Sequence, residues 1–83
     1  MSEQAKPHEV EILVNERPVK IAGPRAQGLP IKQAAVAQSV PIQLDFVLSE
    51  ELGERKSRVV GDNEDVSVTD HARFIAVAPD DNS

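Results

Sequence analysis

The chain has 83 residues and a formal net charge of −5, with 40% hydrophobic and 28% charged residues. This length and balance predict one small globular domain. The acidic balance argues against nonspecific nucleic-acid binding, which needs Lys and Arg to displace counterions from phosphates, but it suits a basic partner surface. The chain has no cysteine, which excludes disulfides, thiolate nucleophiles and cysteine-ligated metals, and favours a reducing compartment.

The first residues carry no targeting signal. Residues 1–8 are polar, contain Pro7 and show no period, so we expect a disordered leader. They have no apolar stretch of the kind that a secretory signal needs, and no apolar run in the chain approaches the roughly 18 residues of a membrane span. We therefore expect a cytoplasmic protein that binds no membrane.

Residues 9–22 predict a β-hairpin. β-Branched residues occupy every second position on both sides of a turn-prone tetrad, residues 15–18: Val10, Ile12, Val14, Val19 and Ile21. Pro18 cannot donate to a ladder and belongs in the turn or at the start of the second strand. Gly23-Pro24 should end that strand, and residues 25–28 are expected to be a plain connection.

Residues 29–38 change the period from two to that of a helix. Ile31, Ala34, Ala35 and Gln38 recur at the i, i+3, i+4, i+7 spacing of one helical face. Pro30 suits a first helical position, because its missing N–H would be unpaired there, and Pro41 should end the helix by about Ser39. So short a helix must pack on the sheet.

The second half of the chain predicts further extended segments. Residues 43–49 alternate as a strand, residues 50–54 read as a charged turn, and residues 55–60 as a second short strand. Residues 64–69 predict a brief extended or turn-like segment, and residues 73–78 the final strand, which Pro79 ends. The side chains expected to face the helix are Leu44, Phe46, Leu48, Phe74 and Ala76.

These elements assemble into one arrangement. Parallel strands need a crossover connection, and a helix after a hairpin supplies one. The first and last strands can then lie side by side at the sheet centre, with the helix across one face. We predict an α+β fold of the β-grasp type, a mixed sheet of four to five strands with one short helix, over residues 9–78. Residues 79–83 would be a flexible tail.

Several motifs follow one another in a recognisable order. They are Val10-Glu11-Ile12-Leu13-Val14-Asn15, Val19, Ile31 with Ala34-Ala35, Asp45-Phe46-Val47-Leu48, Asp62-Asn63-Glu64-Asp65-Val66 and Arg73-Phe74-Ile75-Ala76-Val77. In order and spacing they resemble the bacterial multiubiquitin-type ubiquitin-like proteins over residues 9–78. The resemblance implies a ubiquitin-like β-grasp fold and a protein modifier, which is a substrate of enzymes, has no catalytic residues of its own and needs no cofactor.

The resemblance also implies partners. Such modifiers occur in conjugation operons with an activating enzyme, a conjugating enzyme and a processing peptidase. The C-terminal carboxylate would be adenylated, passed to an enzyme thiol and joined to a target protein. The chain departs from the family in carrying one copy, where tandem copies are frequent.

The tail, Pro79-Asp80-Asp81-Asn82-Ser83, is the candidate conjugation segment. Acyl activation needs an extended, unhindered carboxylate, which is why most ubiquitin-like modifiers end in Gly-Gly. No glycine follows Phe74 here, as in some bacterial relatives, and this disfavours a sulfur-carrier role. Ser83 itself or a residue exposed by a peptidase would be the reactive end. The alternative interpretation is an ordinary frayed terminus.

Val47, Ile75 and Val77 are the candidate partner-binding face. By the strand alternation they point away from the helix, and exposed apolar residues on a small domain often mark a partner site. A one-residue register error would exchange the two faces, and scattered surface residues are the plain alternative. The face supports a second hypothesis, a β-grasp module that binds a partner and is never conjugated.

The remaining polar clusters carry little chemistry. The only basic cluster is Arg55-Lys56-Ser57-Arg58. We interpret it as solvent-exposed side chains on a strand, with docking to an acidic enzyme surface as the alternative. His8 and His71 do not make a metal site, and Asp70-His71 has no partner nucleophile. Residues 62–65 lack the spacing of a calcium loop, so we expect neither catalysis nor metal binding.

Overall fold

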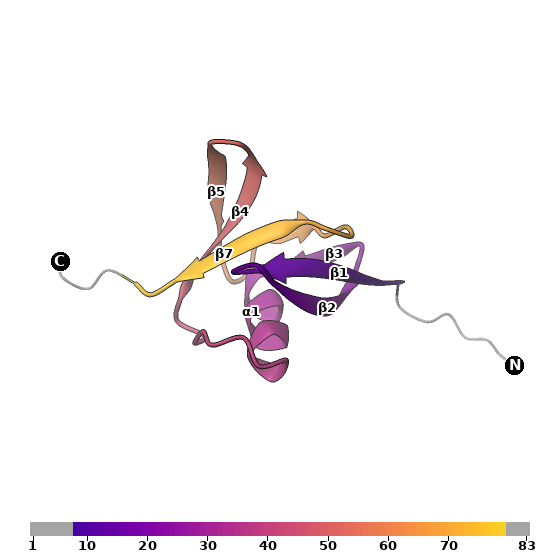
Figure 1. The fold of residues 1–83 in the computed structure, drawn as a ribbon, viewed down its shortest axis with the longest axis horizontal. Helices are drawn as coiled ribbons and strands as arrows, with labels where there is room; N and C mark the ends of the chain where they lie inside the picture. The colour runs from indigo at the N-terminus through magenta and orange to yellow at the C-terminus, as the bar shows by residue number, and fades with distance from the viewer. Residues whose placement is uncertain (1–7, 80–83) are drawn as a thin grey trace, which may run out of the picture.

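A computed structural model gives the structure, which describes residues 8–79. It contains one helix and seven strands (Figure 1): β1 (His8–Val14), β2 (Arg17–Gly23), β3 (Arg25–Gln27), α1 (Gly28–Ala37), β4 (Val47–Gly53), β5 (Lys56–Val60), β6 (Asp65–Ser67) and β7 (Arg73–Val77). The expected leader lies outside the described residues except for His8, which already belongs to β1. Of the expected tail, only Pro79 is described.

The predicted sheet is confirmed. Its strand order is β2-β1-β7-β4-β5, and β1 and β7 are parallel neighbours while the other pairs are antiparallel. α1 lies across one face of this sheet (Figure 1). The chain therefore has the α+β ubiquitin-like β-grasp fold, with the first and last strands at the sheet centre.

The hairpin of β1 and β2 turns on two residues. Asn15 and Glu16 both have positive φ values, 53° and 68°, which is the backbone of a tight turn that matches the twist of the flanking strands. Pro18 lies within β2 opposite Leu13, and β2 is an edge strand, where a missing N–H is tolerated.

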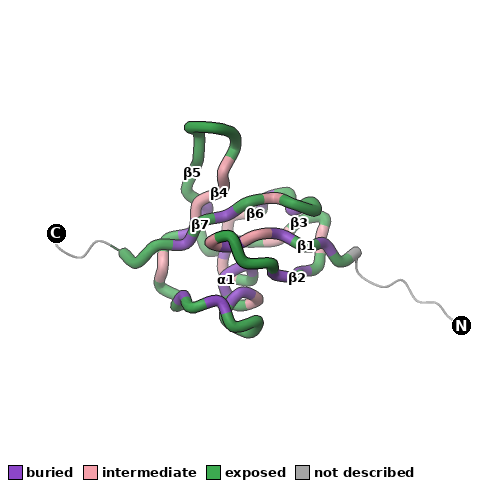
Figure 2. The backbone as a smooth tube through the Cα atoms, viewed as in Figure 1, coloured by how far each residue is buried: buried purple, intermediate pink, exposed green. Residues whose placement is uncertain are grey.

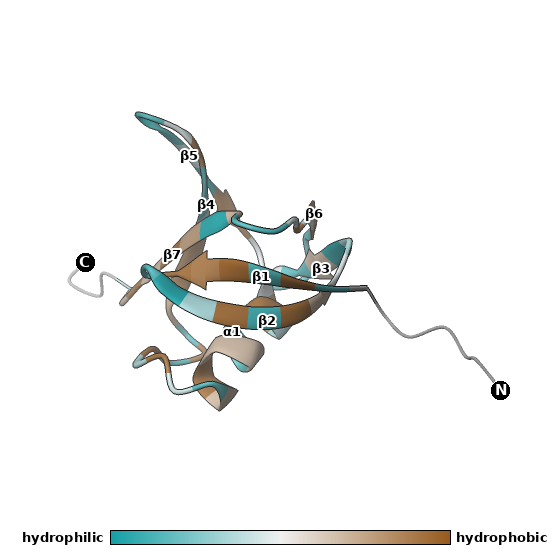
Figure 3. Ribbon diagram, turned by 45° about the vertical axis from the view of Figure 1, so that its right-hand side comes forward, coloured by the Kyte–Doolittle hydropathy of each residue, from teal (hydrophilic) through white to brown (hydrophobic). Residues whose placement is uncertain are grey.

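The core lies between the sheet and α1. It contains every β-branched residue that the hairpin pattern predicted, together with Ile31 and Ala35 from the helix and Phe74 and Ala76 from β7. Phe74 is the largest fully buried side chain. Val40 and Ile42, in the loop after the helix, extend the core although the sequence pattern did not indicate them. The hydropathy colouring follows this arrangement, with apolar residues concentrated along β1 (Figure 3).

The helix begins one residue earlier than predicted and ends at Ala37. Pro30 is its third residue rather than its first, a position that is still free of intrahelical N–H bonds. Gly28 packs so closely on β5's end that a Cβ atom there would lie 2.3 Å from the Gly61 carbonyl oxygen. Gln38 faces solvent instead of the core, and its side chain bonds to β2.

The prediction of a strand over residues 43–49 is wrong in its first half. Residues 43–46 form a turn closed by the Phe46 N–H, which donates to the Gln43 carbonyl at 3.0 Å, and β4 begins only at Val47. Leu44 is therefore exposed and Phe46 half-buried, while Leu48 is buried as expected. The error arose because apolar residues recur at every second position through residues 43–49, although the backbone turns at residues 43–46.

The predicted charged turn at residues 50–54 is also wrong, because β4 continues through Glu50 and Glu51 to Gly53. The true turn is Glu54-Arg55. Glu50 and Glu51 pair across the ladder with Arg58 and Ser57, so strand pairing holds these polar residues extended. The β4–β5 hairpin projects from the body and is exposed over its outer part (Figure 2).

Residues 25–28 are more than the expected connection. β3 pairs with β6 in a second, two-stranded sheet, with Ala26 opposite Val66. Of the two forms predicted for residues 64–69, extended or turn-like, the structure shows the extended one over Asp65–Ser67, and Val66 and Val68 are buried. Each strand alone is too short to reveal its partner from local pattern.

Candidate recognition face and terminal strand

The alternation of β7 places its side chains on two faces. Phe74 and Ala76 are buried, whereas Ile75 and Val77 are 38% and 52% exposed. Val77 lies opposite Val47 of β4, which is 37% exposed, and Ile75 lies opposite Ser49. Since residues paired across a ladder point to the same face, the three predicted residues share the face away from the helix. That they bind a partner stays a prediction.

A fourth apolar residue extends this face. Val59 of β5 lies opposite Ser49 and is 61% exposed, so it joins the two valines and the isoleucine across β4. We call Val47, Val59, Ile75 and Val77 the open face. Sequence reasoning missed Val59 because the face to which a β5 residue points depends on the β4–β5 register, which a short basic strand does not reveal.

The Asn15 side chain holds β7 to β1. Its Oδ1 accepts a hydrogen bond from the Ala76 N–H at 2.8 Å, and its Nδ2 donates to the Ala76 carbonyl at 3.0 Å. The Asn15 N–H also donates to the Phe74 carbonyl at 2.9 Å. The amide therefore continues the parallel ladder past the point where β1 turns into the hairpin, and it fixes β7 near its C-terminal end.

The turn before β7 completes the pairing of β1 at the other end. Asp70 Oδ1 accepts from the Glu11 N–H at 2.9 Å, and the His71 N–H donates to the Glu11 carbonyl at 2.8 Å. His71 takes a φ of 75°, which places its N–H toward β1. The Asp70-His71 pair is thus accounted for by strand alignment.

The chain leaves the sheet at the C-terminal end of β7. Its last ladder pair is Val47 with Val77, and Ala78 and Pro79 follow without ladder pairing and are exposed. The tip of β7 points outward from the body (Figure 1). Of the predicted conjugation tail, Asp80, Asp81, Asn82 and Ser83 lie outside the described residues.

Comparison with known protein families matches residues 10–80 to the multiubiquitin family. The chain belongs to the multiubiquitin family. The match spans the hairpin, the helix and the final strand, which is the set of motifs that carried the resemblance in sequence. No curated protein and no solved structure matches this multiubiquitin domain.

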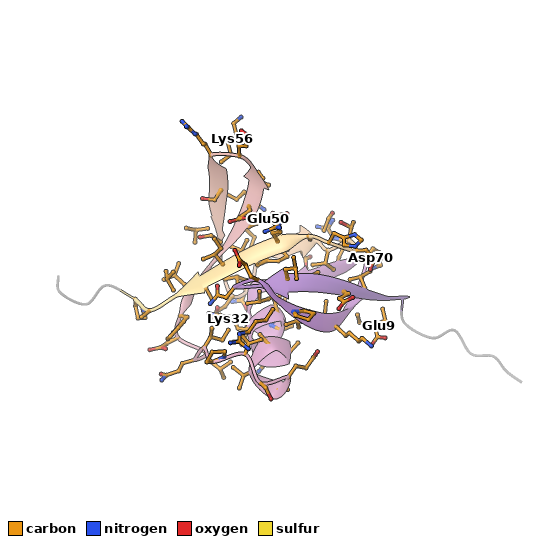
Figure 4. All side chains as sticks on the ribbon, viewed as in Figure 1. Glu9, Lys32, Glu50, Lys56 and Asp70 are labelled. Carbon is orange, nitrogen blue, oxygen red and sulfur yellow. The ribbon has the colours of Figure 1, made fainter. Side chains whose placement is uncertain are left out.

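The multiubiquitin domain contains a buried lysine that sequence reasoning missed. Lys32 of α1 is 4% exposed; its Nζ donates to the Phe46 carbonyl at 2.8 Å and pairs with Asp62 Oδ1, also at 2.8 Å. The ammonium of Lys32, which is labelled in Figure 4, thus ties the helix to the turn before β4 and to the loop after β5. Its position in the helix could have indicated this burial: Lys32 is four residues after Gly28 and three before Ala35, so it lies on the packed side of the helix.

The basic cluster of β5 divides into two parts. Arg58 Nη1 pairs with Glu64 Oε2 at 2.7 Å, and its Nε lies 3.7 Å from Glu50 Oε1. The hydrogen bond from the Gly61 N–H to Glu64, followed by the Arg58 side chain, lowers the pKa of the Glu64 carboxyl below its ordinary value of 4.5. Lys56, by contrast, lies at the hairpin tip (Figure 4) and has no ion pair among residues 8–79.

The described residues lack two kinds of feature, a metal-binding cluster and a membrane-spanning helix. Residues 8–79 contain no group of three or more His, Cys, Asp or Glu side chains arranged to hold a metal ion. Within the same part of the chain, no helix has the length and apolar character required to cross a membrane.

Proposed function

We propose that this multiubiquitin domain is a protein modifier of a bacterial ubiquitin-like conjugation pathway. The carboxylate at the end of the segment after β7 is adenylated by an activating enzyme, passed to the thiol of a conjugating enzyme and transferred to a target protein. The domain is a substrate of these enzymes and carries out no catalysis itself. The observation that carries this proposal is the multiubiquitin match over residues 10–80.

The architecture supports the proposal in two ways. Asn15 and the β4 ladder hold β7 on both sides, so the segment that begins at Ala78 leaves from a rigid point. A fixed exit favours delivery of a short tail into an enzyme cleft, because less conformational freedom is lost on binding. Val47, Ile75 and Val77 of the open face lie on β4 and β7, the strands nearest that exit, where an enzyme that receives the tail would contact them.

The cysteine-free composition fits a reducing cytoplasm, in which we place this pathway. A processing peptidase is part of the proposal, since the acidic sequence Asp80-Asp81-Asn82-Ser83 is bulkier than a Gly-Gly end. Trimming would expose a carboxylate nearer to Pro79.

The test is incubation with ATP and with activating and conjugating enzymes of a bacterial ubiquitin-like pathway, followed by intact mass measurement. We expect a thioester adduct on the enzyme, which added thiol removes, and a conjugate on a target. The full-length protein and a set of versions trimmed after residues 79–82 are compared. If none of these proteins forms an adenylate, thioester or conjugate, the proposal is wrong.

The second candidate is a β-grasp module that binds a partner through the open face and is never conjugated. It is favoured by the exposure of Ile75 and Val77 on a face that no element covers in residues 8–79. Conversion of the mature C-terminal carboxylate to a carboxamide separates the candidates. A pure binding module keeps its activity after this change, whereas a modifier loses it, because a carboxamide cannot be adenylated.

A further inference from the structure

The five-stranded sheet has two edges, and the domain treats them differently. At the β2 edge, the Gln38 side chain bonds to both main-chain groups of Lys20: the Lys20 N–H donates to Oε1 at 2.9 Å, and Nε2 donates to the Lys20 carbonyl at 2.7 Å. Pro18 removes a further N–H from this strand. Both devices make pairing of β2 with another strand unfavourable.

The β5 edge has no comparable cover. β5 pairs with β4 on one side, and among residues 8–79 no other hydrogen bond reaches the main chain of Lys56–Val59. A β-strand directs alternate N–H and C=O groups to opposite sides, so half of those in β5 face away from the sheet. The hairpin projects from the body, which leaves this outer side accessible (Figures 1 and 2).

Charge on the hairpin is sorted by strand. The inner strand β4 carries Glu50 and Glu51, whereas the outer strand β5 carries Lys56 and Arg58, with Glu54 and Arg55 in the turn. Two β5 strands paired with each other would bring these cations together, which opposes self-association. An incoming acidic strand would meet opposite charge instead.

The side chains of β5 alternate in chemistry as well as in direction. Lys56 and Arg58 point to one face of the hairpin, and Ser57 and the exposed Val59 point to the other. A strand added to this edge would place its own side chains in the same alternation. Its acidic residues would lie beside Lys56, which has no ion pair among residues 8–79, and beside Arg58, whose pairs with Glu64 and Glu50 leave Lys56 as the main attraction. Its apolar residues would lie beside Val59, where they continue the open face outward.

We propose that the outer edge of β5 binds an extended segment of a partner protein in which acidic and apolar residues alternate. The segment adds a sixth strand to the sheet through main-chain hydrogen bonds, which supply affinity, while the charges select acidic sequences. The site uses neither the tail nor activation of a carboxylate, so it stands or fails independently of the proposed function.

The probe is an acetylated and amidated peptide of three Val-Asp repeats, titrated into the 15N-labelled full-length domain in low salt. We expect saturable changes of amide chemical shift along Lys56–Val59, with Kd rising at least about threefold when the salt concentration rises from 50 to 200 mM, because exposed charges are screened. A peptide of Val-Lys repeats should not bind.

Matched charge reversals locate the site. Lys56→Glu should weaken binding of the Val-Asp peptide about tenfold, since an exposed attraction becomes a repulsion. Lys20→Glu makes the same charge change on the β2 edge and should leave Kd unchanged within twofold. The amide spectra of both variants check that the fold is retained, and the Val-Lys peptide tests the charge requirement on the unaltered protein.

N-methylation of the peptide tests strand addition itself. Methyl groups on alternate amides block one edge of the peptide, so one of the two methylation patterns should abolish binding and the other should preserve it. The proposal is overturned if the peptide does not bind at millimolar concentration, if both patterns bind equally, or if the shifts concentrate at Ile75 and Val77 without Lys56–Val59. Shifts along β5 that depend on protein concentration alone would identify a second copy as the occupant and would also overturn it.

Discussion

The Asn15 side chain should contribute strongly to the stability of this domain, and three substitutions separate its contributions. Asn15→Gly keeps the positive φ and removes both hydrogen bonds to Ala76, which are part-buried and join residues 61 positions apart. At about 0.5–1.5 kcal/mol net for each bond, the loss in the free energy of unfolding should be roughly 1–3 kcal/mol. For a domain of this size, about 2 kcal/mol lowers Tm by about 8–16 °C.

Asn15→Ala should cost about 1 kcal/mol more than Asn15→Gly, because alanine takes the left-handed backbone unfavourably. Asn15→Asp keeps the acceptor for the Ala76 N–H but replaces the donor with an oxygen that faces a carbonyl, so it should also destabilise. Chemical denaturation gives the free energies, and amide hydrogen exchange gives the local effect. In Asn15→Gly the Ala76 amide should exchange faster than the slowest core amides.

Two results would refute this reasoning. One is a Tm of Asn15→Gly within about 2 °C of the original protein, which would mean that the two bonds contribute nothing net. The other is unchanged protection of the Ala76 amide relative to the core, since that N–H donates to the Asn15 Oδ1 at 2.8 Å.

Three further predictions concern the turn, the helix start and the Glu64 carboxyl. Glu16→Gly relieves the φ of 68° and should stabilise by about 0.5–1 kcal/mol in denaturation, whereas a loss would contradict the turn geometry. Gly28→Ala should destabilise by more than about 3 kcal/mol despite a better helix propensity, because the new Cβ would lie 2.3 Å from the Gly61 carbonyl oxygen. Gly61→Ala is the control: the nearest atom to its new Cβ would be 3.9 Å away, so it should cost under about 1 kcal/mol. Because the pKa of Glu64 is lower in the folded state, its carboxylate stabilises the fold at pH values above the unfolded pKa of about 4.5, and this contribution is lost as pH falls through the folded pKa. The free energy of unfolding of Glu64→Gln should therefore depend less on pH below about 4.5 than that of the original protein. Equal pH dependence in the two proteins would refute the assigned cause.

The sequence predicted those parts of the fold in which one face of a strand is buried and the other is exposed to solvent. Val10, Ile12 and Val14 alternate because β1 has such faces, and Phe74 and Ala76 do the same in β7. This contrast also placed Ile75 and Val77 on the open face. In such a strand, both the apolar residues and the buried positions recur at every second residue, so the buried face can be predicted without knowledge of distant residues.

The errors arose where pairing with a distant segment overrides local composition. Glu50 and Glu51 read as a turn because charged runs usually do, yet β5 holds them in a strand. Leu44 continued an apolar alternation through a segment that bends. In both places the deciding partner lies elsewhere in the chain.

The polar contacts were hidden for the same reason. Lys32 is buried only because the Phe46 carbonyl and Asp62 come together above the helix, and neither partner lies in its own element. The roles of Asn15 and Gln38 depend likewise on β7 and β2. Side-chain bonds across the fold have no periodic signature, so a single sequence offers only the residue types.

The most direct test of the proposed modifier function is ATP–pyrophosphate exchange by the activating enzyme of the proposed pathway. Adenylation joins the carboxylate oxygen to the α-phosphate of ATP and releases pyrophosphate, so labelled pyrophosphate returns to ATP only when a free carboxylate is present. Two samples are compared, each with the mature C-terminus: one ends in a carboxylate and the other in a carboxamide. The proposal predicts exchange that depends on the carboxylate protein and is absent with the carboxamide, and equal exchange with both, or none with any carboxylate form, would contradict it.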